Sequence, residues 1–334
     1  MRIKYVLAVI GLLALGLFVW LAWEEIAEAV RLIRGFDWYI LLLIIPIQLF
    51  NYLVRAWAYQ SVLSYFGYYI RTGRLYAMAW VVNFVTLTMP SLGVSAASAV
   101  GMALQPYQVP AGAAVMVQYT KYGLTLISFL VVLLVGVVSL FLTGVGNDAV
   151  VQFVALVGVG IIGLMAVAVY LLSNQRAFNW AMYHVQAFID WTSQKLRHGK
   201  KLIGAERVNK LLRELYRGFQ DIVQQRAYLK RPFLFALCGN VIDVALLYLF
   251  FVAVGYMINP AIVIVTYALA NSTGFVSIVP GDVGVYELVM IAVLTAAGVP
   301  LSVGLSVTLT YRVVVKFLFL PIGLFFYSRL VKEV

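Results

Sequence analysis

The hydrophobic positions of this sequence fall into long apolar runs separated by short polar segments. An α-helix needs about 20 residues to cross the hydrocarbon core of a membrane. Six runs reach or approach that length, and they therefore predict about six full transmembrane helices. These runs are Tyr5 to Ala22, Trp38 to Trp57, Tyr122 to Thr143, Val150 to Leu172, Pro232 to Tyr256 and Val303 to Phe326.

Two further apolar regions are interrupted by helix-breaking residues. Leu75 to Leu104 contains Pro90-Ser-Leu-Gly93, and Ala261 to Ala297 contains Pro280-Gly-Asp-Val-Gly284. At about 1.5 Å per residue, the pieces on either side of Pro90 are roughly 20 Å long, which is too short to span alone. We therefore predict two re-entrant helical hairpins. Their hinge residues are Pro90, Gly93, Pro280, Gly281, Asp282 and Gly284.

The two interrupted regions share an order of features. In each, a glycine-valine pair follows the first proline, and a second proline, Pro110 or Pro300, stands 20 residues after the first. A cation comes next, Lys121 in the first copy and Arg312 in the second. This shared order indicates an internal repeat.

The composition is that of a membrane protein. Of the 334 residues, 64% are hydrophobic and 11% are charged, and the mean hydropathy is +0.98; soluble globular domains do not reach such values. Cys238 is the one cysteine, and His184 and His198 lack the spacing of metal ligands. We therefore expect no disulfide framework, no metal site and no cofactor.

The formal net charge of +11 does not indicate nucleic-acid binding, because half of the basic residues lie in one loop. Residues 174–231 carry twelve Lys or Arg against four Asp or Glu. This is the positive-inside pattern of a cytoplasmic loop. The predicted organisation is a single transmembrane domain, residues 1–334, with repeats at about 37–143 and 231–331 on either side of the loop.

The other basic clusters predict how the chain is oriented. Arg2 with Lys4, Arg55 to Arg74, and Arg329 to Lys332 all fall on the cytoplasmic side when the runs are threaded in order. The two hairpins then enter from opposite sides, so the repeat is inverted. The predicted fold is all-α, with about six transmembrane helices plus two re-entrant hairpins in an inverted repeat. We expect a multi-pass protein of the cytoplasmic (inner) membrane with both termini in the cytoplasm.

Two segments have alternative interpretations. Tyr5 to Ala22 resembles a signal peptide, but no small-x-small cleavage site follows it, so we expect a retained span. Glu206 to Gln225 places its apolar residues on one helical face, which predicts a helix on the membrane surface. That helix is either an interfacial linker or an element that binds a partner or lipid headgroups.

Four charged residues fall inside the predicted spans or hairpins: Lys121, Asp243, Glu287 and Arg312. A charge at the bilayer centre costs about 2.5–3.5 kcal/mol even on the lenient translocon scale, so embedded charges are normally paired or wetted. Either Lys121 and Arg312 are each neutralised by one of the two acids, or the four groups line a polar cleft and contact a charged headgroup.

Other polar residues at similar depth are substrate contacts or hydrogen-bonding groups between helices. Glu287 has a local role as well, because a helix that begins after Gly284 holds it in the first turn, where a carboxylate stabilises the exposed amides. The same amides are able to hold a phosphate. The candidate substrate-binding residues are Glu287, Arg312, Lys121, Asp243, Asn83 and Asn271.

A family resemblance is visible at the second hairpin. Pro280-Gly-Asp-Val-Gly-Val-Tyr-Glu287, followed by Ala296-Ala-Gly-Val-Pro300 and Tyr311-Arg312, resembles the Pro-Gly-Gly-x-Gly-x-x-Glu segment of the lysylphosphatidylglycerol synthase transmembrane-region family of flippase-like proteins. The resemblance covers essentially the whole chain. It implies translocation of a membrane phospholipid between leaflets, in the best-known members an aminoacylated phosphatidylglycerol.

The sequence departs from the family pattern in the first hairpin. Family members carry a Gly-Glu pair followed by Arg there, whereas Gly93-Val-Ser-Ala-Ala-Ser98 has no charge, and Asp282 replaces a usual glycine. The identity of the headgroup is therefore left open. The chain ends at Val334, so we expect a separate enzyme to carry out any lipid modification. The sequence leaves open whether the protein is a homodimer.

Two other functions are compatible with these features. A secondary transporter of a small solute would use Asp243 or Glu287 as its coupling-ion site. A lipid-modifying membrane enzyme is the weaker alternative, because the sequence has no paired His and acid near the interface and no nucleotide-binding loop. We expect a lipid translocator that is not an enzyme.

Overall fold

The computed structural model describes residues 31–32, 34–88, 94–143, 159–160, 163, 166–167, 170–171, 173–196, 226–273, 282 and 284–333. All regular elements in these residues are helices, as predicted. Four helical stretches in the described part are long and apolar enough to cross a membrane, so this is a multi-pass membrane protein. They are α3 (Trp38–Tyr65), α6 (Ala111–Thr143), α10 (Lys230–Ala253) and the stretch Leu301–Lys332.

Some predicted elements lie outside the described residues. They are the first span, Tyr5 to Ala22, nearly all of Val150 to Leu172, and the surface helix Glu206 to Gln225. Within the predicted basic loop, the structure adds a helix that was not expected, α8 (Gln175–Leu196). The Asn174 side chain caps it by accepting the Arg176 backbone N–H at 2.9 Å.

Helix α3 is longer than its apolar run predicted, since it ends at Tyr65 rather than Trp57. The extra turns carry polar residues that lower their hydropathy, but Ser61 and Ser64 hydrogen-bond to backbone carbonyls of their own helix. At the start, Asp37 accepts the Tyr39 backbone N–H at 3.0 Å and caps the helix. Arg55, which stands near the end of the predicted span, therefore lies about three turns before the end of the helix.

Helix α6 is also longer than predicted, because it begins at Ala111 instead of Tyr122. Its start directly follows Pro110, and α13 (Leu301–Tyr311) directly follows Pro300 in the same way. Proline cannot donate a backbone hydrogen bond, so it is well suited to the boundary of a helix. As a result Lys121 lies within α6, about three turns from its start.

The two interrupted regions each form a pair of short helices. The pairs are α4 (Thr72–Thr88) with α5 (Val94–Leu104), and α11 (Pro260–Ser272) with α12 (Val285–Ala296). The described helices end and begin on either side of the predicted hinges, and the two members of each pair pack against each other. Asp282 and Gly284 have φ angles of 56° and 90°, so the backbone turns just before α12 begins. The other hinge residues, Pro90, Gly93, Pro280 and Gly281, lie outside the described part of the chain.

A π-helical turn interrupts the last long stretch. It is η5 (Arg312–Phe317), between α13 and α14 (Leu320–Glu333). The Leu318 N–H donates to the Val313 carbonyl five residues earlier at 2.8 Å. Such turns occur frequently at functional sites. The Val315 carbonyl accepts a hydrogen bond from Gln48 Nε2 of α3 at 3.2 Å, which ties the turn to the neighbouring helix.

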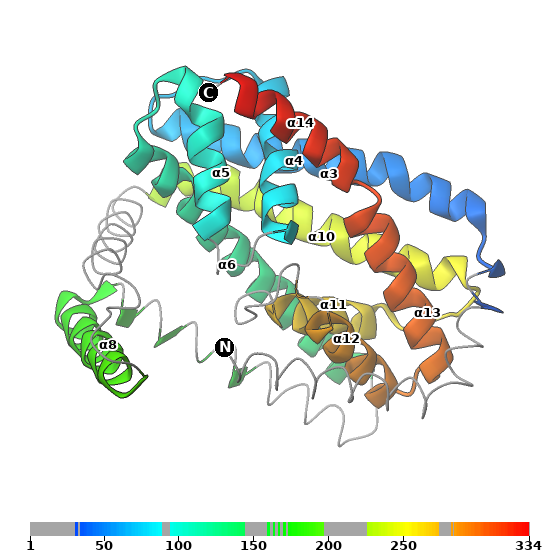
Figure 1. The fold of residues 1–334 in the computed structure, drawn as a ribbon. Coiled ribbons are helices and arrows are strands. Elements are labelled where there is room, and N and C mark those ends of the chain that lie inside the picture. Colours follow the sequence, from blue (N-terminus) through cyan, green and yellow to red (C-terminus); the bar gives the residue numbers. More distant parts are fainter. Residues whose placement is uncertain are drawn as a thin grey trace.

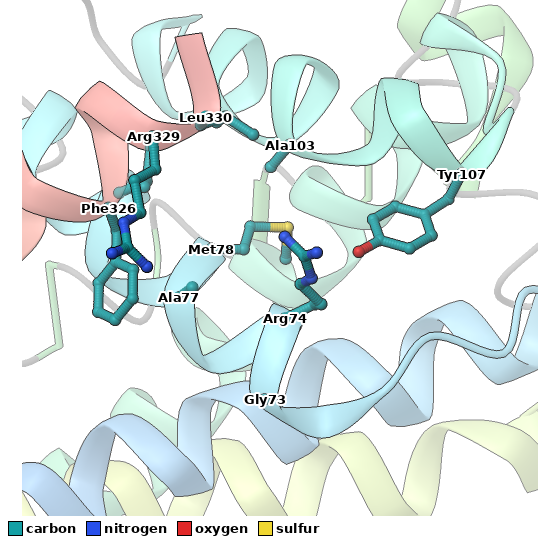
Figure 2. A pocket seen from close by; sticks show the side chains of 10 residues that line it. Gly73, Arg74, Ala77, Met78, Ala103, Tyr107, Phe326, Arg329 and Leu330 are labelled. Carbon is teal, nitrogen blue, oxygen red and sulfur yellow. The ribbon is translucent and has the colours of Figure 1, made fainter. Parts of the chain in front are cut away.

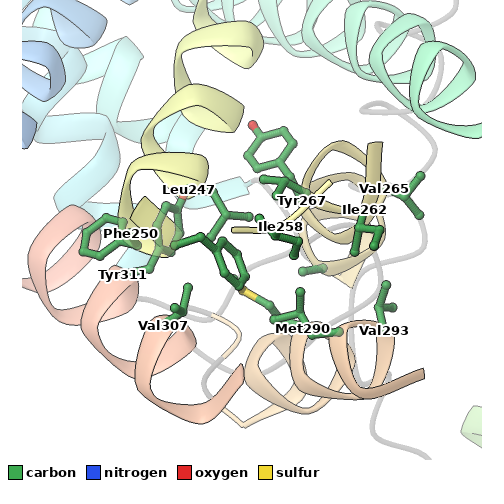
Figure 3. Close-up of a cluster of buried hydrophobic side chains, with 14 of the residues drawn as sticks. Leu247, Phe250, Ile258, Ile262, Val265, Tyr267, Met290, Val293, Val307 and Tyr311 are labelled. Atoms are coloured by element: carbon green, nitrogen blue, oxygen red, sulfur yellow. The ribbon is translucent and has the colours of Figure 1, made fainter. Parts of the chain in front are cut away.

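Helices α3 and α10 pack side by side, with α4, α5 and α14 toward one end of the molecule and α11, α12 and α13 toward the other (Figure 1). Each group has its own apolar core. In the core near α11, side chains of four helices interlock, among them Phe250, Tyr267, Met290 and Tyr311 (Figure 3). The order of contacts α3–α4–α5–α6 is repeated as α10–α11–α12–α13.

Two glycines allow close contacts between these groups. A Cβ atom on Gly136 of α6 would lie 2.7 Å from Ile264 Cγ2 of α11, and one on Gly323 of α14 would lie 2.6 Å from Phe84 Cβ of α4. Small residues at such crossings let helices approach closely in a membrane. In each case the last helix of one predicted repeat packs on the first short helix of the other.

Candidate functional site

The carboxylate of Asp243 is the centre of a buried polar network. It lies in α10 and is only 4% exposed. Oδ1 accepts Asn51 Nδ2 at 2.6 Å, and Oδ2 accepts Arg55 Nη2 at 2.9 Å. The Tyr267 hydroxyl lies 3.2 Å from Oδ2. A buried carboxylate requires such partners, and here they join α3, α10 and α11.

The network extends through Asn240 to α6. The Tyr267 hydroxyl is also 3.2 Å from Asn240 Oδ1, so its single proton is shared between two acceptors. Asn240 Nδ2 donates to Ser128 Oγ at 2.7 Å. Polar groups therefore connect four helices, α3, α6, α10 and α11, within an otherwise apolar bundle.

A cavity of about 160 Å³ lies against this network. Three of the predicted site residues line it, namely Lys121, Asp243 and Asn271. Two further cations, Arg55 and Lys316, line it as well. The walls thus come from α3, α6, α10, α11 and the π-turn, which means that both predicted repeats contribute.

Lys121 reaches the cavity from α6. Its ammonium nitrogen lies 4.8 Å from the centroid of the Tyr59 ring, a cation–π contact. The Tyr59 hydroxyl donates to Gln118 Oε1 at 2.7 Å, which fixes the ring. On the far side of the cavity, Lys316 is in the π-turn, and Asn271 donates to the Tyr267 carbonyl at 2.9 Å.

Glu287 and Arg312 form a second polar site at the start of α12. Arg312 Nε lies 2.6 Å from Glu287 Oε1, and the Gly284 backbone N–H donates to Glu287 Oε2 at 2.7 Å. The predicted place of Glu287 in the first helical turn is confirmed. The guanidinium of Arg312 also stacks over the Tyr286 ring, with 4.6 Å between Cζ and the ring centroid.

The four predicted charges do not form two ion pairs with one another. Arg312 pairs with Glu287, as one reading allowed, but Asp243 pairs with Arg55 rather than with Lys121. Asn83 of α4 is half-buried and does not line the cavity.

Sequence reasoning missed Arg55 and Lys316 as parts of the site. Lys316 lies inside the apolar run Val303 to Phe326, so the criterion that identified Lys121 would have found it. Arg55 gave no such signal, because it stands near the end of its apolar run.

Two other hollows lie nearer the ends of the helices. A groove of about 990 Å³ is lined by Trp57, Tyr65, Tyr228 and Arg231, and it adjoins the central cavity at Phe235, which lines both. A pocket of about 300 Å³ lies between α4, the end of α5 and α14 (Figure 2). It contains none of the predicted site residues.

Arginines from two helices line this 300 Å³ pocket. Arg74 comes from the first turn of α4 and Arg329 from α14, and Met78 and Phe326 also line the pocket (Figure 2). The Arg329 guanidinium is stacked on Phe325, with Cζ 4.4 Å from the ring centroid. Tyr107 closes the opposite side (Figure 2).

The comparisons with known proteins support the resemblance seen in the sequence. No curated protein matches the chain. A family model described as the lysylphosphatidylglycerol synthase TM region matches residues 6–323, nearly the full length. With its broken helices, embedded charges and this match, the chain belongs to the lysylphosphatidylglycerol synthase TM region family.

Proposed function

We propose that this protein moves a phospholipid or a lipid-linked headgroup between the leaflets of the cytoplasmic membrane, without chemical conversion. The central cavity is the observation that carries the proposal. Charged residues inside a membrane are costly, and they usually mark the path of a substrate or ion. Here Arg55, Lys121, Asp243 and Lys316 gather around one hollow within apolar helices. A headgroup that crosses the bilayer needs such a polar site, while its acyl chains stay in lipid.

The arrangement of helices supports alternating access to that cavity. The matching contact orders of α3–α6 and α10–α13, and the matching close approaches at Gly136 and Gly323, favour an inverted repeat with two re-entrant hairpins. In such a repeat the cavity is exposed to one leaflet at a time. The adjoining groove at Phe235, with Arg231 near its rim, provides a route for the headgroup from the predicted cytoplasmic side.

A solute transporter coupled through an embedded carboxylate receives less support. A coupling cation needs an acid that is free to bind it. Asp243 is held by Arg55 at 2.9 Å, and Glu287 is held by Arg312 at 2.6 Å. Both acids are therefore already neutralised by arginines.

Leaflet exchange in proteoliposomes tests the proposal. The purified chain is reconstituted with fluorescent anionic, zwitterionic or cationic lipids, and a membrane-impermeant quencher reports how fast the label changes leaflet. We expect faster exchange than in protein-free vesicles for at least one lipid class. Equal rates with and without protein across all three classes would remove lipid translocation as the function.

A further inference from the structure

The central cavity carries more positive than negative charge. Among the described residues that line it, Arg55, Lys121 and Lys316 are cationic and Asp243 is the one acid. Asp243 is already engaged by Arg55 at 2.9 Å. The two lysines therefore leave a formal excess of two positive charges in the walls.

Neither lysine forms a salt bridge within the described part of the chain. The ion pairs recorded there join Arg55 to Asp243 and Arg312 to Glu287. Lys121 instead rests against the Tyr59 ring, a contact that stabilises a cation without neutralising it. Glu287 and Asp282 do not line the cavity. Ammonium groups at this depth are costly unless a counter-charge accompanies them.

A difference between the two repeats accounts for one of the two excess charges, that of Lys121. Arg312, the cation of the second repeat, is neutralised by Glu287, which stands three residues after the hinge glycine Gly284. In the first repeat the residue three positions after Gly93 is Ala96, so Lys121 has no acid in the matching place. A ligand can then supply the negative charge that the first repeat lacks.

The two ammonium groups are the donors of the lining that suit phosphate oxygens. The Tyr267 hydroxyl already donates within the network, to Asp243 and Asn240. The Asn240 amide already donates to Ser128 Oγ and to the Thr125 carbonyl. Ammonium groups form charge-assisted hydrogen bonds with phosphate oxygens, and both lysines line the cavity. A headgroup that carries its own amine would bring a further positive charge into the same small volume.

We propose that the cavity selects a lipid whose headgroup is a net-negative phosphate ester, with Lys121 and Lys316 as its counter-charges, and disfavours cationic headgroups. The inference rests on the proposed function for its setting, yet binding tests it separately from transport. It assigns this chain a different headgroup class from the aminoacylated lipid that the family resemblance suggests.

Thermal unfolding of the full chain in detergent provides the binding test. The probes are phosphatidylglycerol, phosphatidylcholine, a phosphate-free trimethylammonium lipid and inorganic phosphate. We expect phosphatidylglycerol to raise Tm most and the cationic lipid least. Inorganic phosphate distinguishes the two sources of the anion. A saturable Tm shift equal to that of phosphatidylglycerol supports a site that recognises the phosphate group alone. A larger Tm shift with phosphatidylglycerol supports a site that recognises the whole lipid.

Variants of the two lysines link the preference to the cavity. Lys121→Gln and Lys316→Gln should each weaken phosphatidylglycerol binding by about tenfold, the loss of one charge-assisted hydrogen bond. Because an unpaired buried charge is removed, Tm without lipid should stay the same or rise. Lys332→Gln, an exposed lysine near the end of α14, is the matched control and should leave binding unchanged.

Two results would overturn the inference. One is an equal Tm shift with phosphatidylglycerol and phosphatidylcholine, and the other is an unchanged preference in both lysine variants. The proposed function fails separately: selective binding of the anionic lipid without leaflet exchange would remove translocation and leave the site. Equal exchange rates for all lipid classes would keep translocation and remove the charge selection.

Discussion

The two broken helical regions of this protein have the same layout and different chemistry. In both, the second short helix begins directly after a glycine, at Val94 in α5 and at Val285 in α12. The second region carries Glu287, which binds the Gly284 amide and Arg312. The first region carries no acid in its second arm. The second broken region therefore neutralises the cation that follows it, Arg312, while the first leaves Lys121 to line the central cavity.

This difference indicates that the two halves have separate tasks. The local pair of Glu287 and Arg312 holds the start of α12 against the last long helix, a contact that must change if the hairpin moves. The lysine of the first half supplies charge to the cavity. We propose that the repeated layout holds one mechanical site and one binding site, because a single position holds Glu in one copy and Ala in the other.

The largest effect is expected from removing the acid that both halves share. Asp243→Ala leaves the partly buried Arg55 guanidinium without its carboxylate. Removing one partner of a fully buried pair costs about 3–5 kcal/mol, and the 29% exposure of the Arg55 side chain places the expected cost at the lower end of that range. We expect a marked fall in Tm in detergent and loss of lipid exchange. Asp243→Asn, which keeps an acceptor for Asn51, is the control and should be less destabilised. An Asp243→Ala protein with the Tm of the parent would show that the network does not hold α3 to α10.

Breaking the local pair should abolish transport and lower Tm while the protein stays inserted, because either single change leaves one partner without its counter-charge. Glu287→Ala or Arg312→Ala removes the link between α12 and the π-turn, but most of the apolar core remains. We expect exchange at the rate of protein-free vesicles, with membrane insertion and monodispersity like the parent. If both variants exchange lipid normally, this pair is not part of the transport machinery. Lys332→Ala provides a control at an exposed position on the same long helix.

Replacing the two close-contact glycines by alanine should destabilise the protein to different extents. Gly323→Ala places a Cβ atom 2.9 Å from the Trp80 backbone oxygen, which cannot move aside, whereas Gly136→Ala meets side-chain atoms of Ile264 and Val265. We expect overpacking to cost about 1–3 kcal/mol, with Gly323→Ala at the upper end. Thermal unfolding ranks the two. Gly101→Ala, in a helix with open space around it, is the control and should be neutral or stabilising.

The smallest effect is expected at the π-turn. Gln48→Leu removes the hydrogen bond to the Val315 carbonyl and should cost about 1 kcal/mol. Because the turn carries Lys316, we expect weaker anionic-lipid binding together with a small fall in Tm. Unchanged binding in Gln48→Leu would show that the turn holds its shape without this contact.

Much of the architecture was readable from local sequence. Proline and glycine located the breaks between α4 and α5 and between α11 and α12, because they act on the backbone where they stand. The boundary prolines Pro110 and Pro300 marked the starts of two long helices. Glu287 was predicted in a first helical turn for the same kind of reason. Hydropathy was less accurate at helix ends, where Ser61 and Ser64 satisfy their own hydrogen bonds inside α3.

The sequence by itself determined the membrane class, the all-α fold, the family and the place of Glu287 in a first helical turn. It left the partner of Arg312 open, and the structure assigned it to Glu287, 25 residues earlier. Only the tertiary structure decided that Asp243 pairs with Arg55, 188 residues away, and that Lys316 joins Lys121 at one cavity. The physical reason is that hydropathy and turn chemistry act through neighbours along the chain. The partner of a buried charge depends instead on which helix faces meet, and packing sets those faces.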